Sequence, residues 1–142
     1  GPTLLAREAA ERMRAAGTPG AIVLLASMQA LYVFENSTAY AAAKAALVHA
    51  ARTLAKECGG MADIRVNVVA PGVTTAGMAE ASVRSGKYDR FLAGGAIPRW
   101  GRAEDVARAV RFFLEPDNYI TGQVLAVDGG LTLRRDLAVS SQ

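Results

Sequence analysis

The feature that most constrains the fold of this chain is the run of six apolar residues at positions 21–26, Ala-Ile-Val-Leu-Leu-Ala. An uninterrupted apolar run of this length, without the alternation of a half-exposed strand, is typical of a parallel strand buried on both faces. Residues 64–69 and 123–127 predict two further strands, and helical patterns precede and separate the three. This order of strands and helices indicates an α/β protein with a parallel sheet.

Three helices are predicted around these strands, over residues 3–16, over residues 37–58, and from 102 or 103 to about 114. Their apolar residues recur at helical spacing, and capping residues or glycines mark their ends. The helix over 37–58 is rich in alanine, whose small side chain lets another backbone approach closely.

A candidate catalytic set lies around the first strand. Ser27 directly follows the strand, at the carboxyl end where open α/β sheets bind their ligands. Tyr40 and Lys44 are four residues apart in a predicted helix, so their side chains share one face. An ammonium beside a phenol favours the phenolate, which suits the phenol to acid–base chemistry near neutral pH. The same spacing also occurs in solvated pairs on the surface of ordinary helices, so the Tyr-Lys pair alone does not identify a catalytic site.

The order and spacing of Ser27, Tyr40 and Lys44 resemble the catalytic set of the short-chain dehydrogenase/reductases. The resemblance continues in register through three further stretches, which are residues 65–72 (Arg-Val-Asn-Val-Val-Ala-Pro-Gly), 98–102 (Pro-Arg-Trp-Gly-Arg) and 120–130 (Ile-Thr-Gly-Gln-Val-Leu-Ala-Val-Asp-Gly-Gly). It implies the second half of a doubly wound Rossmann-type parallel sheet, with three strands and flanking helices. The match begins at the helix before the serine strand and ends at the last strand.

The first half of such a domain is absent from this sequence. None of the 14 glycines forms the glycine-rich turn that cradles a dinucleotide pyrophosphate, and no acidic residue follows a second strand to bind a ribose. Residues 1–142 are therefore predicted to be a partial domain, from a truncated, proteolysed or naturally split member of the family.

The resemblance implies an NAD(P)-dependent oxidoreductase that interconverts an alcohol and a ketone by hydride transfer. In that mechanism Tyr40 is the acid/base, Lys44 favours the phenolate and binds the nicotinamide ribose, and Ser27 orients the substrate oxygen. NAD and NADP are both compatible, because the residues that read the 2′ position lie in the missing half. The alternative is a non-catalytic half-domain, serving in assembly or binding or arising by proteolysis, which is unable to bind the cofactor alone.

Further site residues are carried over from the family by position. The cofactor contacts implied are Tyr40, Lys44, Pro71, Gly72 and Val73. The family's threonine position is occupied by Ala76, so Thr74 or Thr75 is expected to make that contact instead.

Substrate contacts are expected from Ser27, Gln29, Phe34 and Met78, although an aromatic residue in the loop over 27–36 also fits simple packing. Residues 75–97 resemble the family's substrate loop, and residues 131–142 form a C-terminal tail. By the same resemblance, helices 3–16 and 37–58 imply a homo-oligomer, either a dimer or a tetramer.

Other classes of protein are disfavoured by composition. The net charge of +3 comes from 13 Arg and 3 Lys, but the arginines are scattered among acids and lack the clustering of a nucleic-acid surface. One cysteine, Cys58, excludes an internal disulfide and a multi-cysteine metal site, and no metal is predicted. The only histidine, His49, falls about 180° around the helix from Tyr40 and is expected to be exposed or in an interface. No membrane-length apolar run or signal-peptide pattern is present, so a cytoplasmic protein is predicted.

Overall fold

The computed structural model describes residues 1–59 and 63–133. Three strands form one parallel sheet in the order β1-β2-β3: β1 (Gly20–Leu25), β2 (Ile64–Pro71) and β3 (Val124–Val127). The central strand pairs with β1 from Gly20↔Ile64 to Leu25↔Val69, and with β3 from Val68↔Val124 to Pro71↔Val127. The predicted parallel sheet is confirmed, with strand ends shifted by one or two residues.

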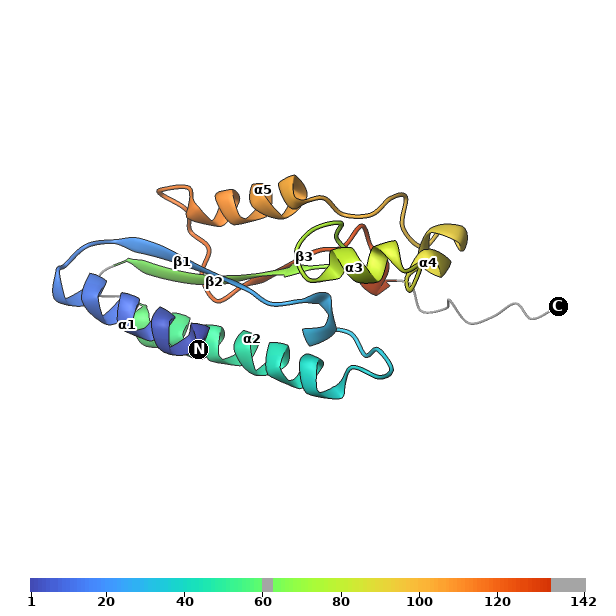
Figure 1. The fold of residues 1–142 in the computed structure, drawn as a ribbon. Helices are drawn as coiled ribbons and strands as arrows, with labels where there is room; N and C mark the ends of the chain where they lie inside the picture. The colour runs from blue at the N-terminus through green and yellow to red at the C-terminus, as the bar shows by residue number, and fades with distance from the viewer. Residues whose placement is uncertain (60–62, 134–142) are drawn as a thin grey trace.

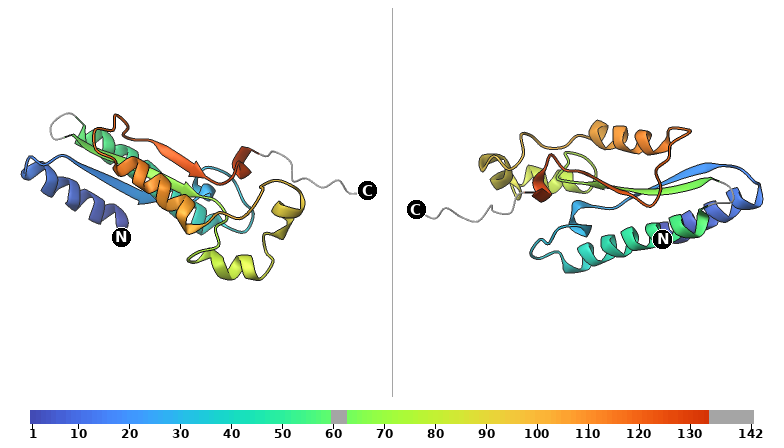
Figure 2. Two further views of the ribbon diagram at one scale, coloured as in Figure 1. Left: turned by 90° about the horizontal axis from the view of Figure 1, so that it is seen from above. Right: turned by 180° about the vertical axis from the view of Figure 1, so that it is seen from behind.

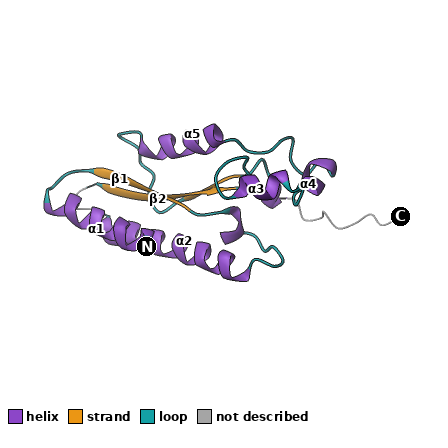
Figure 3. Ribbon diagram, in the orientation of Figure 1, coloured by secondary structure: helices purple, strands orange, loops and turns teal. Residues whose placement is uncertain are grey.

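Helices cover both faces of the sheet, as Figures 1 and 3 show. The helices α1 (Pro2–Ala15) and α2 (Thr38–Cys58) lie on one face, and α5 (Ala103–Leu114) lies on the other. Two short helices, α3 (Ala79–Arg84) and α4 (Asp89–Ala93), lie beyond the carboxyl end of the sheet (Figure 2). Single turns of 3-10 helix follow two strands, η1 (Met28–Ala30) after β1 and η2 (Leu131–Leu133) after β3.

The hydrophobic core has two layers, separated by β2. Residues 64, 66 and 68 of this strand pack with α1 and α2, whereas Val69 packs with α5. This alternation follows from the strand period of two, and burial on both faces explains why the strand is apolar almost throughout. The two polar residues of the strand are also buried and are satisfied by backbone: Arg65 donates to the Phe113 and Glu115 carbonyls, and Asn67 donates to the Ile120 carbonyl.

The helix α1 packs through its small residues rather than its large ones. Ala6 and Ala10 are buried in the core beside α2, while Leu4 is 66% exposed and Leu5 is 72% exposed. Close approach of two helices requires small side chains at the contact, so the alanines take the inner face. The sequence predicted the helix, but its leucines do not mark the side that faces the sheet.

The segment between β2 and α5 is closed at its base. Gly101 donates a backbone hydrogen bond to Val73 (2.9 Å) and accepts one from Thr75 (2.9 Å), so both ends of the segment meet beside the sheet. The loop within this clamp is packed on its own small core, in which Phe91 and Ile97 are buried against Val73 and Met28. Residues 75–97 are therefore a compact excursion with fixed ends, placed beside β1's carboxyl end.

No helix in the described ranges is long and apolar enough to cross a membrane. Of the C-terminal tail expected over 131–142, residues 131–133 form η2. Residues 134–142 lie outside the described residues.

Candidate active site

Ser27 stands where β1 gives way to η1, at the carboxyl end of the sheet. Its backbone is extended, and its Oγ accepts a hydrogen bond from the backbone N–H of Gln29 at 3.2 Å, which caps the 3-10 turn. Ser27 is 8% exposed. Because a hydroxyl is both donor and acceptor, its O–H remains available to donate to a bound oxygen atom.

Tyr40 and Lys44 occupy the first two turns of α2 and lie on one face, as their spacing predicted. The Lys44 Nζ lies 5.7 Å from the centre of the Tyr40 ring. It also donates a hydrogen bond to the Leu25 carbonyl at the end of β1 (3.2 Å), which ties the helix to the strand. An ammonium carries three N–H donors, so this bond leaves donors for a ligand. Tyr40 is 38% exposed, which leaves the ring accessible.

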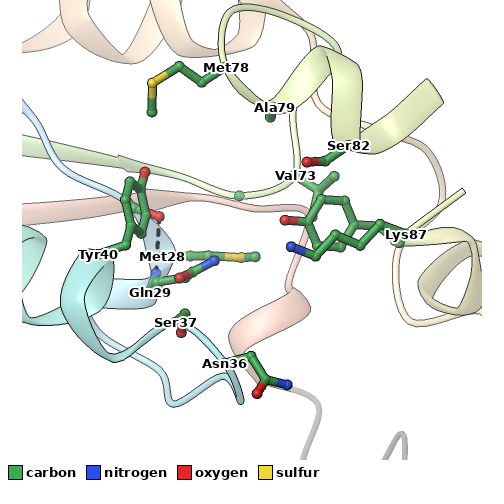
Figure 4. A pocket seen from close by; sticks show the side chains of 13 residues that line it. Met28, Gln29, Asn36, Ser37, Tyr40, Val73, Met78, Ala79, Ser82 and Lys87 are labelled. Carbon is green, nitrogen blue, oxygen red and sulfur yellow. Dashed lines mark hydrogen bonds between the residues drawn. The ribbon is translucent and has the colours of Figure 1, made fainter. Parts of the chain in front are cut away.

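Ser27 and Tyr40 line one cavity of about 250 Å³ at the carboxyl end of the sheet (Figure 4). The turn after β1 with η1, the start of α2, the two residues after β2 and the segment over 75–97 all contribute to its walls. The lining residues are Ser27, Met28, Gln29, Asn36, Ser37, Tyr40, Gly72, Val73, Met78, Ala79, Ser82, Lys87 and Tyr88. Two of the three predicted catalytic side chains thus meet in one cavity, and the third, Lys44, lies one helical turn beyond Tyr40.

The residues predicted to contact the cofactor follow β2. Pro71 ends the strand, and Gly72 and Val73 line the cavity beside Tyr40. The two threonine hydroxyls donate to backbone: Thr74 to the Gly72 carbonyl at 3.2 Å and Thr75 to the Gly101 carbonyl at 3.3 Å.

The residues predicted to contact the substrate divide between two adjoining cavities. Gln29 and Met78 line the cavity with Tyr40, whereas Phe34 lines a second cavity of about 480 Å³. Phe34 also packs edge-on against the rings of Tyr32 and Phe91. Gln29 lines both cavities and so stands between them.

Sequence reasoning missed several polar residues of the cavity wall, which are Asn36, Ser37, Ser82, Lys87 and Tyr88. The last three come from the segment over 75–97, whose weak periodicity gives no indication of which side chains point inward. Asn36 has a φ of 58°, a conformation that asparagine tolerates better than most residues. The residue type at this position is therefore a weak sequence indication of a turn here.

A second polar cluster fixes the start of α5 on the other side of the clamped loop. The Asp105 carboxylate accepts hydrogen bonds from the Arg99 guanidinium at 2.6 and 3.0 Å and from the Arg102 backbone N–H at 2.9 Å. The bonds from Arg99 and then Arg102 hold the pKa of the Asp105 carboxyl well below its usual range. This cluster ties the end of the loop to α5.

The remaining candidate reactive side chains lie apart from this cavity. Cys58 is a buried free thiol at the end of α2. His49 is exposed on α2.

Three parallel strands with helices on both faces make up half of a doubly wound, Rossmann-type sheet. A family model described as enoyl-(acyl carrier protein) reductase matches residues 1–132. The chain therefore belongs to the short-chain dehydrogenase/reductase family.

Three similar proteins illustrate the match. The chain is 39% identical over 113 residues to the 3-oxoacyl-(acyl-carrier-protein) reductase FabG of Chlamydia trachomatis, which covers 79% of this chain and 45% of that protein. A 4-hydroxyisoleucine dehydrogenase complexed with NADH superposes with a TM-score of 0.84 at 29% identity, over 94% of this chain and 56% of that one. ElxO with NADP bound gives a TM-score of 0.75 at 30% identity, over 89% of this chain and 51% of that one. The chain spans about half the length of the curated relatives it matches.

Proposed function

We propose that this chain is the catalytic half of an NAD(P)-dependent oxidoreductase that interconverts an alcohol and a ketone, with Tyr40 as acid/base. The observation that carries the proposal is the presence of Ser27 and Tyr40 in one cavity, with Lys44 one turn along the same helix. Membership of the family supports the reaction class. The two similar structures with bound cofactors, one with NADP and one with NADH, support both cofactors equally.

Each of the three side chains has a role in the proposed reaction. Tyr40 donates a proton to the carbonyl oxygen in reduction and takes it back in oxidation. Lys44, beside the Tyr40 ring, uses its remaining N–H donors on the ribose. Ser27 donates its O–H to the same substrate oxygen and orients it. A bound nicotinamide would supply or accept the hydride.

The residues after β2 fit the nicotinamide end of the cofactor. No described residue accepts a hydrogen bond from the Val73 backbone N–H, although the Val73 carbonyl is bonded to Gly101. A free amide donor beside Tyr40 is the kind of group that a carboxamide oxygen accepts from. We assign Pro71, Gly72 and Val73 to this contact, and keep Thr74 or Thr75 as the side-chain partner, because either hydroxyl can accept from the carboxamide NH2 while it donates to backbone.

Tyr40→Phe tests the assignment, in the full-length protein that carries this chain with its cofactor-binding half. Turnover of alcohol or ketone should fall by more than 10³-fold, because only the proton-transfer group is lost. The dissociation constant for NAD(P)H, measured by fluorescence titration, should stay within a few-fold of wild type. Tyr119→Phe, at a fully exposed tyrosine away from the cavity, is the matched control. Activity of Tyr40→Phe within tenfold of wild type would remove the tyrosine from this role.

The alternative is a non-catalytic half-domain that serves in assembly or binding, or a proteolytic fragment. It is favoured by the span of the match, which is about half of each relative. The reading frame upstream of Gly1 separates the two, because a glycine-rich turn encoded there in frame supports the enzyme.

The proposed oligomer forms through α1 and α2, as a dimer or a tetramer. Leu4 and Leu5 are exposed on α1, and exposed alanines line the outer side of α2. An apolar face with small side chains suits close helix packing between copies of the chain.

A further inference from the structure

We propose that the substrate of this site carries a negatively charged group, a carboxylate in the first instance, which binds between Lys87 and Gln29. This inference rests on the proposed function, because it concerns the compound whose carbonyl oxygen Tyr40 protonates. It adds a substrate class, the oxo acids and their hydroxy acid counterparts.

The charge of the cavity wall favours an anionic ligand. Among the described residues that line the cavity, Lys87 is the only charged one, and no Asp or Glu accompanies it. Its Nζ lies 5.4 Å from the centre of the Tyr88 ring, and it forms no ion pair with any residue in the described ranges. Figure 4 shows the Lys87 amine pointing into the cavity from the side opposite Tyr40. An unpaired ammonium in a cavity without acids attracts anions and repels cations.

The amide of Gln29 independently favours a ligand that accepts hydrogen bonds. Its Oε1 is buried and has no hydrogen-bond partner among the described residues. Its Nε2 donates to no described residue, and Figure 4 shows the amide directed across the cavity toward Lys87. Because the oxygen is the buried end, the cavity receives the two N–H donors of the amide.

Two sets of unused donors therefore face one space, and a carboxylate accepts from both. A carboxylate has two oxygens with about four lone-pair sites, so it can bind an ammonium and an amide together. The hydroxyl of Ser82, which also points into the cavity, adds a further donor (Figure 4). A neutral ester in the same place would leave the ammonium without a counter-charge. The reacting carbonyl then lies at Ser27 and Tyr40, across the cavity from the charged group.

The experiment measures kcat and KM of the full-length protein with cofactor, for oxo acids of four to six carbons and for their methyl esters. We expect kcat/KM for the best acid to exceed that of its ester by at least tenfold. In Lys87→Met this preference should be lost, with KM for the acid raised about tenfold and the ester little changed, since one charge-assisted bond is removed. Lys87→Arg should keep most of the preference, and Gln29→Leu should raise KM for the acid several-fold.

Three results would overturn the inference. One is equal turnover of acid and ester by the wild-type protein. Another is an unchanged KM for the acid in Lys87→Met. The third is weaker binding of NAD(P)H in that variant, with the preference for acids intact, which would assign the lysine to the cofactor. A phosphate ester preferred over every oxo acid would keep the anionic site but reject the carboxylate.

Failure of the proposed function gives a different pattern. If no carbonyl compound or alcohol is turned over, the oxidoreductase assignment fails, and binding alone then decides the anion site. Saturation-transfer NMR with the wild-type protein and Lys87→Met compares each acid with its ester without turnover. Preferential binding of the acid that is lost in Lys87→Met supports the site, and equal signals for acid and ester reject it.

Discussion

The carboxyl group of Asp128 holds the turn that follows β3. It accepts hydrogen bonds from the backbone N–H groups of Gly130 and Thr132, each at 2.9 Å, and from the Thr132 hydroxyl at 2.6 Å. Partial burial alone would raise the pKa of the Asp128 carboxyl, but the bonds from Thr132 and Gly130 outweigh burial and lower the pKa. The ionised carboxylate therefore stabilises this turn.

Asp128→Asn should lower the free energy of unfolding of the full-length protein by about 1 kcal/mol at pH 7, allowing for solvent screening. The folded-state pKa is depressed, so this contribution is present above the unfolded value of about 3.9 and is lost as pH falls through the folded value. Urea unfolding at a series of pH values measures both effects. The difference between wild type and variant should shrink below about pH 4.

Glu57→Gln is the control for this pH series, because Glu57 is exposed and its side chain makes no hydrogen bond to a described residue. It should change the unfolding free energy by less than about 0.5 kcal/mol at every pH. An Asp128→Asn variant as stable as wild type at pH 7 would show that the three bonds contribute nothing net.

Among single residues, the sequence predicted those whose relation is local and missed those that a loop brings in. Ser27 directly follows an apolar strand, and Tyr40 and Lys44 are one helical turn apart, so short-range spacing is enough to place them. Lys87 reaches the cavity only because residues 75–97 fold back on their own core. No periodicity in that segment encodes which side chain turns inward.

At the scale of elements, the junction of β2 and β3 depends on Gly72. A Cβ added at this glycine would lie 2.7 Å from both Cα and Cβ of Asp128, which is closer than atoms can approach. The Gly72 N–H also donates to the Val127 carbonyl at 2.9 Å, so the ends of β2 and β3 cannot separate without losing that bond. Glycine is required here for close approach of two backbones.

Gly72→Ala should therefore lower the free energy of unfolding by about 3 kcal/mol, since overpacking against backbone cannot be relieved by a side-chain rotation. Gly59→Ala is the matched control, because its nearest atoms would be ordinary contacts at 3.5 and 3.6 Å. Thermal or urea unfolding of the two variants gives the comparison. Equal stability of Gly72→Ala and Gly59→Ala would show that the β2–β3 junction moves freely.

The elements themselves were predictable from sequence, and their faces were less so. Strand β2 is clear in the sequence because it is buried on both sides, and α2 because its alanine-rich run ends at two glycines. Ser37 stands at the start of α2, but its side chain makes no cap hydrogen bond. In α1 the largest apolar residues, Leu4 and Leu5, are exposed, and the contact with the core uses Ala6 and Ala10. A hydrophobic pattern cannot distinguish a face that packs on the sheet from one that is left for another partner.

At the scale of the whole molecule, β1 has one open edge. Within the described residues it pairs with β2 alone, so the backbone groups on its other side have no strand partner. Its apolar residues carry no charge or proline to discourage pairing with another chain. Leu25, at the end of the strand, is 50% exposed.

We expect that the 142-residue chain by itself is not a stable monomer and has no measurable affinity for NAD or NADP. The open edge recruits another copy or a complementary half, and the glycine-rich turn that binds a pyrophosphate is absent from this sequence. Sedimentation equilibrium at micromolar concentration and calorimetric titration with each cofactor are the measurements. A compact monomer that unfolds cooperatively, or micromolar cofactor binding, would contradict the half-domain architecture.

The placement of α2 and α5 on opposite faces fixes the handedness of the two crossovers. The strands advance in one direction, β1-β2-β3, so two helices on opposite faces must give connections of opposite hand. In the left view of Figure 2, the strands run from left to right, α5 lies in front of the sheet, and β3 lies on the upper side of β2. A right-handed crossover would place β3 on the lower side, so β2–α5–β3 is the left-handed one. About 98% of such crossovers are right-handed, because a right-twisted strand leads its helix back that way.

Residues 72–102 carry the chain from the end of β2 to α5 on the face opposite α2. The segment that lines the cavity with Tyr40 therefore also belongs to the connection that leads to α5. Replacing residues 79–95 by a short turn would remove a wall of the cavity and also shorten the path on which the position of β3 depends.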